Sequence, residues 1–238
     1  MQIRTLTTLV VLGFLFGAAN TNAVLVDFDS NLEGFVSDPF DPGDTGPITH
    51  QATAGSGGDI GWAGVTIDTT NTTVGGPFPG LNKGTNADFA GDLLAKHGAG
   101  GGNTTLTLSV DFMLSQSMAD FNGFGPRFIT PGGGERDWIF DNFGAGPVTG
   151  GVWNTRSLTF DTTWSNLEAT AAGWRQIQGG PFSEMVDNVN HFEMKYTRGG
   201  AQLPDGAVLG LDNFDIFPEP ASLSLLAVGG LIMLRRRR

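Results

Sequence analysis

Tryptophan and aspartate are the residues of this sequence whose types and neighbours are best suited to chemistry. The five tryptophans are Trp62, Trp138, Trp153, Trp164 and Trp174. An exposed indole ring stacks on the apolar face of a sugar, and nearby polar side chains then bind the hydroxyl groups. Trp138, Trp153 and Trp164 have polar sequence neighbours, so we expect them to bind glycan. The alternative is that these rings fill the core, as most tryptophans do.

No catalytic motif accompanies these residues. The three histidines, His50, His97 and His191, are not spaced as in H-E-x-x-H, and no G-x-S-x-G sequence occurs. Glycoside hydrolysis needs two carboxylates that face each other, and the spacing of the Asp and Glu residues indicates no such pair. We therefore expect a non-catalytic protein, and the alternative is a secreted glycan-active hydrolase with an unrecognised site.

The charge and composition narrow the range of partners. The chain has 238 residues, with 13 Lys or Arg against 24 Asp or Glu, and no cysteine. A formal net charge of -11 repels the phosphate backbone of nucleic acids, so a nucleic-acid partner is not expected. The absence of cysteine excludes disulfides, thiolate metal sites and cysteine nucleophiles.

Alternation of apolar and polar residues is the clearest structural pattern. In 104–114 the apolar residues fall on one side of an extended chain: Leu106, Leu108, Val110, Phe112 and Leu114. We expect further strands at 24–28, 60–67, 127–130, 137–141, 157–160, 174–178, 190–196 and 208–217, and at most short helical turns in 86–97 and 183–189. Many short strands joined by turns predict an all-β, jelly-roll-like antiparallel β-sandwich, with one domain over 24–217.

The last predicted strand changes phase along its length. Leu209 and Leu211 share one parity, whereas Phe214 and Ile216 have the other. Either a bulge near Asp212 shifts the register, or the strand is buried on both faces.

Residues 1–23 have the parts of a secretory signal peptide. Arg4 supplies a positive charge, residues 6–16 form a short apolar run, and Ala23 ends a cleavage site of small residues. We expect the Sec machinery to export the chain and signal peptidase to cleave it after Ala23. The alternative is a short membrane anchor, although the run is short for a span.

The tail at 218–238 has three parts in a fixed order. The first part is a short motif of Pro218, Glu219 and Pro220, and the second is an apolar stretch at 221–234. The third is a basic end that consists of Arg235, Arg236, Arg237 and Arg238. As a helix the apolar stretch covers about 21 Å, less than the roughly 30 Å of a bilayer core. It is therefore a marginal transmembrane helix, and the arginines are expected to stop on the cytoplasmic side.

This tail resembles the PEP-CTERM sorting signal, also described as the C-terminal domain of ice-binding proteins. The resemblance covers 218–238 only. It implies recognition by an exosortase-type membrane peptidase in a Gram-negative bacterium that makes exopolysaccharide, with cleavage near Glu219 and then release or re-attachment of the body outside the cell. The alternative is an ordinary tail anchor. Ice binding itself is not expected, because the Thr-rich stretch 69–73 has no repeat.

The two ends of the body also resemble jelly-roll carbohydrate-binding and galactose-binding-like modules. The acidic-aromatic-acidic sequence at 27–29 and the Leu-Asp-Asn sequence at 211–213 carry this likeness. In many such modules the end strands pair and acidic groups from each bind a structural calcium, which implies Asp29 and Asp212 as ligands. Asp29 is one methylene shorter than the Glu often found there. Calcium prefers hard oxygen ligands, and the alternative is that Asp29 caps a turn and Asp212 fills a bulge.

Taken together, these patterns indicate an exported, exosortase-processed surface or extracellular-matrix protein. We expect the tail to anchor it transiently in the inner membrane, and we expect extracellular polysaccharide as its partner. Two alternatives belong to other classes of protein. One is the secreted hydrolase mentioned above, and the other is a purely structural surface protein with no ligand.

Overall fold

The computed structural model of the chain describes residues 24–37, 48–58, 60–66, 79–82, 89–98, 104–121, 124–130, 136–141, 143, 145–196 and 206–218. The expected signal peptide and the part of the expected sorting tail that follows Pro218 lie outside these residues. Within the described residues, no helix is both long enough and apolar enough to cross a bilayer.

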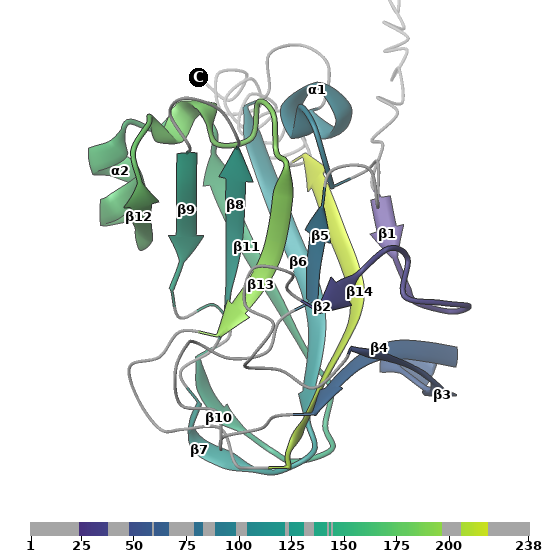
Figure 1. Ribbon diagram of the computed structural model, residues 1–238. Coiled ribbons are helices and arrows are strands. Elements are labelled where there is room, and N and C mark those ends of the chain that lie inside the picture. Colours follow the sequence, from purple (N-terminus) through teal and green to yellow (C-terminus); the bar gives the residue numbers. More distant parts are fainter. Residues whose placement is uncertain are drawn as a thin grey trace, which may run out of the picture.

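The described residues form two antiparallel sheets and a small ribbon (Figure 1). What we call the β6 sheet has the order β11–β6–β14–β4–β3, with β1 beside β14. Its strands are β1 (Val24–Val26), β3 (Thr49–Ala54), β4 (Ile60–Thr66), β6 (Thr105–Leu114), β11 (Asn154–Asp161) and β14 (Val208–Pro218).

The second sheet, which we call the β8 sheet, has the order β12–β9–β8–β13–β5–β2. Its strands are β2 (Val36–Ser37), β5 (Pro79–Asn82), β8 (Phe124–Thr130), β9 (Arg136–Phe140), β12 (Trp174–Gln178) and β13 (His191–Tyr196). The ribbon pairs β7 (Met118–Phe121) with β10 (Gly146–Val148). In Figure 1 it lies at one end of the molecule, and the two short helices lie at the other.

Both α-helices of the described residues begin at a capping side chain. The carboxylate of Asp92 accepts a hydrogen bond from the Ala95 backbone N–H at the start of α1 (Leu93–His97). Ser165 and Glu168 form a reciprocal capping box at the start of α2 (Asn166–Ala171). The helical turn expected in 86–97 is confined to α1. The other expected turn is reduced to the short 3-10 helix η2 (Phe182–Glu184), and a second one, η1 (Ser56–Gly58), lies between β3 and β4.

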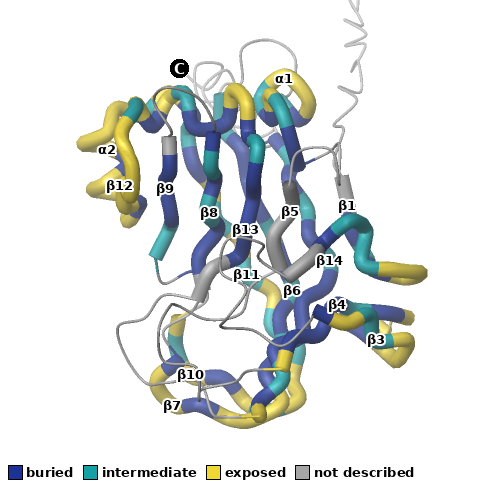
Figure 2. The backbone as a smooth tube through the Cα atoms, viewed as in Figure 1, coloured by how far each residue is buried: buried dark blue, intermediate teal, exposed yellow. Residues whose placement is uncertain are grey.

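The hydrophobic core lies between the two sheets. The five apolar residues of the alternating pattern in β6 are all fully buried, as the sequence predicted. Aromatic rings of the two sheets meet across the core: Phe128 contacts Phe160 with ring centroids 6.2 Å apart, and Phe192 contacts Phe214 at 6.3 Å. Figure 2 shows the central strands buried and the ends of the molecule exposed. The prediction of an all-β antiparallel sandwich is confirmed.

Strand β14 occupies the centre of the β6 sheet. It pairs with β6 on one side and β4 on the other, and its last part pairs with β1, where Val24 lies opposite Ile216. The register with β6 shifts between Asp212 and Asp215, and Asn213 adopts a φ of 48°. This is the bulge that was one of the two alternatives for the change of phase. It lets Leu209 and Leu211 on one side and Phe214 and Ile216 on the other all be buried in the core.

Candidate functional site

Four ionisable side chains gather on the face of the β8 sheet that is turned away from the core. In β13, Phe192 and Met194 belong to the core, so the intervening residues point to the opposite, outer face. The same alternation places Phe128 inward and Arg127 outward in β8. The four outward residues are Arg127, Asp137, His191 and Glu193, and we call them the Arg127 cluster. The register supports this arrangement, because Glu193 lies directly opposite Arg127.

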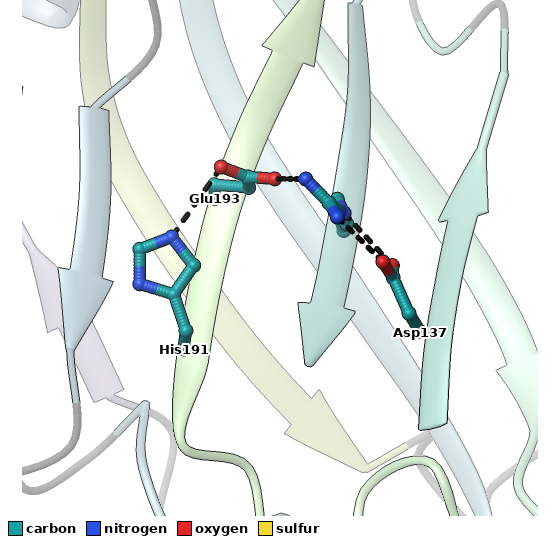
Figure 3. Close-up of polar contacts among 4 residues, drawn as sticks. Asp137, His191 and Glu193 are labelled. Carbon is teal, nitrogen blue, oxygen red and sulfur yellow. Dashed lines mark hydrogen bonds and ion pairs between the residues drawn. The ribbon is translucent and has the colours of Figure 1, made fainter. Parts of the chain in front are cut away.

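Arg127 holds the cluster together by hydrogen bonds to Asp137 and Glu193. Figure 3 labels the other three members and marks the contacts within the cluster as dashed lines. The Nε of Arg127 donates a hydrogen bond to Asp137 Oδ1 at 2.8 Å, and its Nη2 contacts the other oxygen of that carboxylate. Its Nη1 donates to Glu193 Oε1. The second oxygen of Glu193 lies 3.3 Å from His191 Nε2. A guanidinium held by carboxylates on both sides is fixed in position, because the bidentate contact restricts its rotation.

Most of the cluster is inaccessible to solvent. The side chain of Arg127 is 17% exposed, whereas Asp137 is 4% exposed and Glu193 only 1%. Burial lowers the pKa of Arg127, but its hydrogen bonds to Asp137 and the negative charge of Glu193 outweigh this effect, so the net pKa lies above its ordinary value. Charges are expensive to bury and are retained where they are paired. The arrangement therefore presents one cation that stays charged, with the carboxylates held behind it.

Arg127 is the member of the cluster that is best placed to contact a ligand. A guanidinium has five N–H donors, and the three hydrogen bonds within the cluster leave two of them without a partner among the described residues. Sequence reasoning did not single out Arg127. The alternation in 190–196 had indicated that His191 and Glu193 point outward, but it could not show that Arg127 lies beside them.

A second arginine–carboxylate pair lies on the edge of the same sheet. Arg175 in β12 donates two hydrogen bonds to Asp141, the residue after β9, and its Nη2 lies 3.1 Å from Asp141 Oδ1. Its side chain is 54% exposed. The hydrogen bond with Asp141 raises the pKa of Arg175 above its ordinary value. Like the Arg127–Asp137 pair, it is a bidentate arginine–aspartate ion pair, but it is exposed to solvent. It therefore serves as a matched control for substitutions of Arg127.

The tryptophans expected to bind glycan lie in different environments. Trp138 is fully buried in the core, so its ring has no open face. Trp164 is half-buried and stacks on Phe182 with ring centroids 6.1 Å apart. Trp153 is half-buried and contacts Trp62, which sequence reasoning had not selected. The structure does not bring the three expected residues together at one site.

Each aspartate expected to bind calcium lies beside one of two neighbouring glycines, Asp212 beside Gly55 and Asp29 beside Gly61. A Cβ on Gly55 would lie 2.4 Å from Asp212 Oδ2 and 2.5 Å from the Gly61 carbonyl oxygen. A Cβ on Gly61 would in turn lie 2.3 Å from the Phe28 carbonyl oxygen and 3.0 Å from Asp29 Cα. Asp212 is fully buried, whereas Asp29 is exposed. The neighbourhood is therefore rich in oxygen atoms of the kind that calcium prefers.

The carboxylate of Asp212 also has hydrogen bonds within the protein. Its Oδ2 accepts from the Ser56 backbone N–H at 2.8 Å, and its Oδ1 accepts from the N–H of Asn213. No group of three or more His, Cys, Asp or Glu that could hold a metal occurs among the described residues. A calcium ion here would depend on backbone carbonyls for part of its coordination.

No protein-family model and no curated protein matches the sequence. Among solved structures, the chain is similar to an endo-1,4-β-D-xylanase of Clostridium thermocellum that contains a family 22 carbohydrate-binding module and was determined with xylohexaose. The identity is 14% and the TM-score 0.49, over 83% of this chain and 28% of that chain. It is also similar to a family 30 carbohydrate-binding module, at 13% identity and a TM-score of 0.48, over 85% and 90% of the two chains.

A third similar structure is the xylan-binding domain of a Paenibacillus barcinonensis xylanase, at 13% identity and a TM-score of 0.46, over 82% of this chain and 92% of that chain. This chain spans little more than a quarter of the Clostridium xylanase. At these identities and TM-scores the matches assign neither a ligand nor a binding residue to this chain.

Proposed function

We propose that the chain is a non-catalytic glycan-binding module of an exported surface or extracellular-matrix protein, and that Arg127 contacts the glycan. The Arg127 cluster is the observation that carries the proposal. Two N–H donors on a fixed, partly exposed guanidinium are suited to hydroxyl and ring oxygen atoms, because their directions are set before the ligand arrives. The net charge of -11 favours a neutral polysaccharide over a polyanion.

The same geometry favours binding over hydrolysis. A glycosidase needs a carboxylic acid that can give up its proton to the glycosidic oxygen and a second carboxylate that can reach the sugar. In the Arg127 cluster, Asp137 and Glu193 are both hydrogen-bonded to one guanidinium, and both are at least 96% buried. Neither carboxylate has an open side toward a substrate.

The test is the binding of neutral polysaccharides by Arg127→Lys. Lysine keeps the charge but loses the planar fork, so we expect at least about tenfold weaker binding of xylan, laminarin or amorphous cellulose in affinity gels and calorimetry. Arg175→Lys is the control and should bind as the wild type does. Unchanged binding by a folded Arg127→Lys protein removes Arg127 from the site. A wild-type body that binds no polysaccharide overturns the proposed function.

We propose further that the tail is a sorting signal removed by an exosortase-type peptidase. The order of Pro218, Glu219 and Pro220, a short apolar stretch and four arginines supports this proposal. Pro218 is the last residue of β14 and lies opposite Leu106, so the rest of the motif follows directly after the sandwich. Mass spectrometry of the secreted protein should find C-terminal peptides that end near Glu219. Intact peptides that end in the arginines would contradict the proposal.

Calcium remains a proposal for the neighbourhood of Asp29 and Asp212. The oxygen atoms around Gly55 and Gly61 support it, since a cation there would join the start of the body to β14. An ion that binds only the folded protein stabilises it by about 2.7 kcal/mol at a concentration one hundred times its Kd. The melting temperature should therefore fall on addition of a chelator and recover with calcium. A melting temperature that does not respond would remove the metal from this site.

A further inference from the structure

We infer that Trp62 and Trp153 form a second glycan-binding surface, on the outer face of the β6 sheet. Both rings are half-buried, and their centroids lie 5.9 Å apart with the ring planes at 80°. In β4, Ala63 and Val65 belong to the core, so Trp62 points to the opposite face. Trp153 directly precedes β11 on the far side of β6 and β14. Residues from well-separated parts of the chain therefore form one aromatic corner, which we call the Trp62–Trp153 platform.

Two glycines make room for the platform. Gly64 of β4 lies directly opposite Gly210 of β14. A Cβ on Gly64 would lie 2.8 Å from Cζ3 of Trp62, closer than real Cβ contacts allow. A Cβ on Gly210 would lie 3.0 Å from Trp62 Cε3 and 3.1 Å from Trp153 Cη2. The indole rings thus rest directly on the backbone of two central strands, where other residues would hold them off the sheet.

The rings differ in how their polar edges are used. The indole N–H of Trp62 donates a hydrogen bond to Thr53 Oγ1 at 3.1 Å, which fixes the ring over the glycines. The indole N–H of Trp153 makes no hydrogen bond with any residue that the structure describes. A fixed ring beside a ring with an available donor is suited to a sugar, because the C–H face of a pyranose stacks on the first and a hydroxyl accepts from the second.

The ligand class that fits is a neutral polysaccharide. Trp62, Trp153, Gly64 and Gly210 carry no formal charge, and the chain as a whole is acidic. A polyanionic glycan would be repelled by the overall field, and no cation of the platform offsets this repulsion. This inference shares its ligand class with the proposed function, but it concerns the opposite sheet and different residues.

The experiment compares Trp62→Ala and Trp153→Ala with Val152→Ala in affinity gels containing xylan, laminarin or amorphous cellulose. Val152 is 48% exposed and directly precedes Trp153, so its truncation removes apolar surface from the same loop without removing a ring. We expect each tryptophan variant to bind at least about tenfold more weakly, because aromatic residues dominate binding energies. Val152→Ala should bind as the wild type does, and a folded Trp153→Ala protein that also does so would overturn the inference.

A second measurement needs no substitution. Oxidation of the wild-type chain by N-bromosuccinimide, mapped by mass spectrometry, should modify Trp62 and Trp153 more readily than the buried Trp138 and Trp174. Saturating polysaccharide should protect the two platform tryptophans, and unchanged oxidation would overturn the inference. Arg127→Lys separates the two surfaces. If Arg127→Lys alone loses binding, the platform is wrong and the proposed site at Arg127 stands. If the tryptophan variants alone lose binding, the platform stands and Arg127 is not part of a binding site.

Discussion

Replacing Arg127 with methionine is the most direct test of how the outer face of the β8 sheet is stabilised. The variant removes the guanidinium and leaves Asp137 and Glu193 at 4% and 1% exposure. Removing one partner of a buried ion pair costs about 3–5 kcal/mol, because the remaining charge is not compensated. For a domain of this size, 1 kcal/mol shifts the melting temperature by about 2–4 °C. We therefore expect Arg127→Met to melt about 6–20 °C below the wild type at pH 7.

The loss of stability in Arg127→Met should depend on pH and become smaller as the pH falls. Without the guanidinium, burial favours the protonated carboxylic acids over the charged carboxylates. The folded variant then takes up protons more readily than its unfolded chain, so it gains stability as the pH falls from 7 toward about 4, where unfolded Asp and Glu titrate. The difference between variant and wild type should be largest at pH 7 and should shrink at pH 4.

The measurement is thermal and urea unfolding of both proteins at pH 7 and pH 4. Arg175→Met is the matched control, since it breaks the Arg175–Asp141 pair on the same sheet, where the arginine is 54% exposed. Solvent screening should limit its cost to below about 1 kcal/mol. The reasoning would be refuted if Arg127→Met cost no more than the control, or if its cost at pH 4 equalled that at pH 7.

Three further substitutions test other parts of the structure. Gly210→Ala should cost about 1–3 kcal/mol and change the near-UV circular dichroism, because its Cβ would displace Trp62 and Trp153; an unchanged spectrum would contradict the packing of these rings on the backbone. Ser165→Ala should cost about 1 kcal/mol in urea unfolding, since it removes the capping box of α2, and no loss would mean that the cap is replaced by water. Burial raises the pKa of Asp215, so its ionised form lowers stability above that pKa. Asp215→Asn should therefore raise the melting temperature at pH 7 by a small amount that disappears near pH 4, and a lower melting temperature at pH 7 would reverse the sign of the argument.

Most of the longer strands could be predicted from the sequence because apolar and polar residues alternate along them. The pattern in 104–114 predicted β6. The change of phase near Asp212 left a bulge as one of two alternatives for β14, and the register with β6 does shift there. The strands β2, β3, β5, β7 and β10 were missed. Four of them have only two to four residues, which give too little periodicity to detect. Strand β3 has six residues, but none of them is buried, so its sequence carries no alternation of apolar and polar residues. Helix α2 was also missed, although Ser165 and Glu168 have the spacing of a capping box, and that spacing was the available signal.

The candidate sites were harder to predict, because they depend on pairing between distant strands. Nothing local in the sequence links Arg127 to Glu193, and only the register of β8 with β13 places them opposite each other. Whether a tryptophan ring is accessible to a ligand likewise depends on its neighbours in space. Trp138 has charged neighbours in the sequence but lies in the core, whereas Trp62 lies among glycines and is half-buried at the surface. Adjacent residues in a strand point to opposite faces, so polar neighbours in sequence do not indicate an exposed ring.

The central position of β14 has a consequence for the order in which the polypeptide can fold. The last described strand is the one with which β1, β4 and β6 all pair. During synthesis those earlier segments lack their shared partner until residues 208–218 have been made, which disfavours stable folding from the N-terminus onward. Contacts that span most of the chain also slow the search for the native arrangement. A nascent chain of this topology therefore cannot complete the β6 sheet until residues 208–218 have been made.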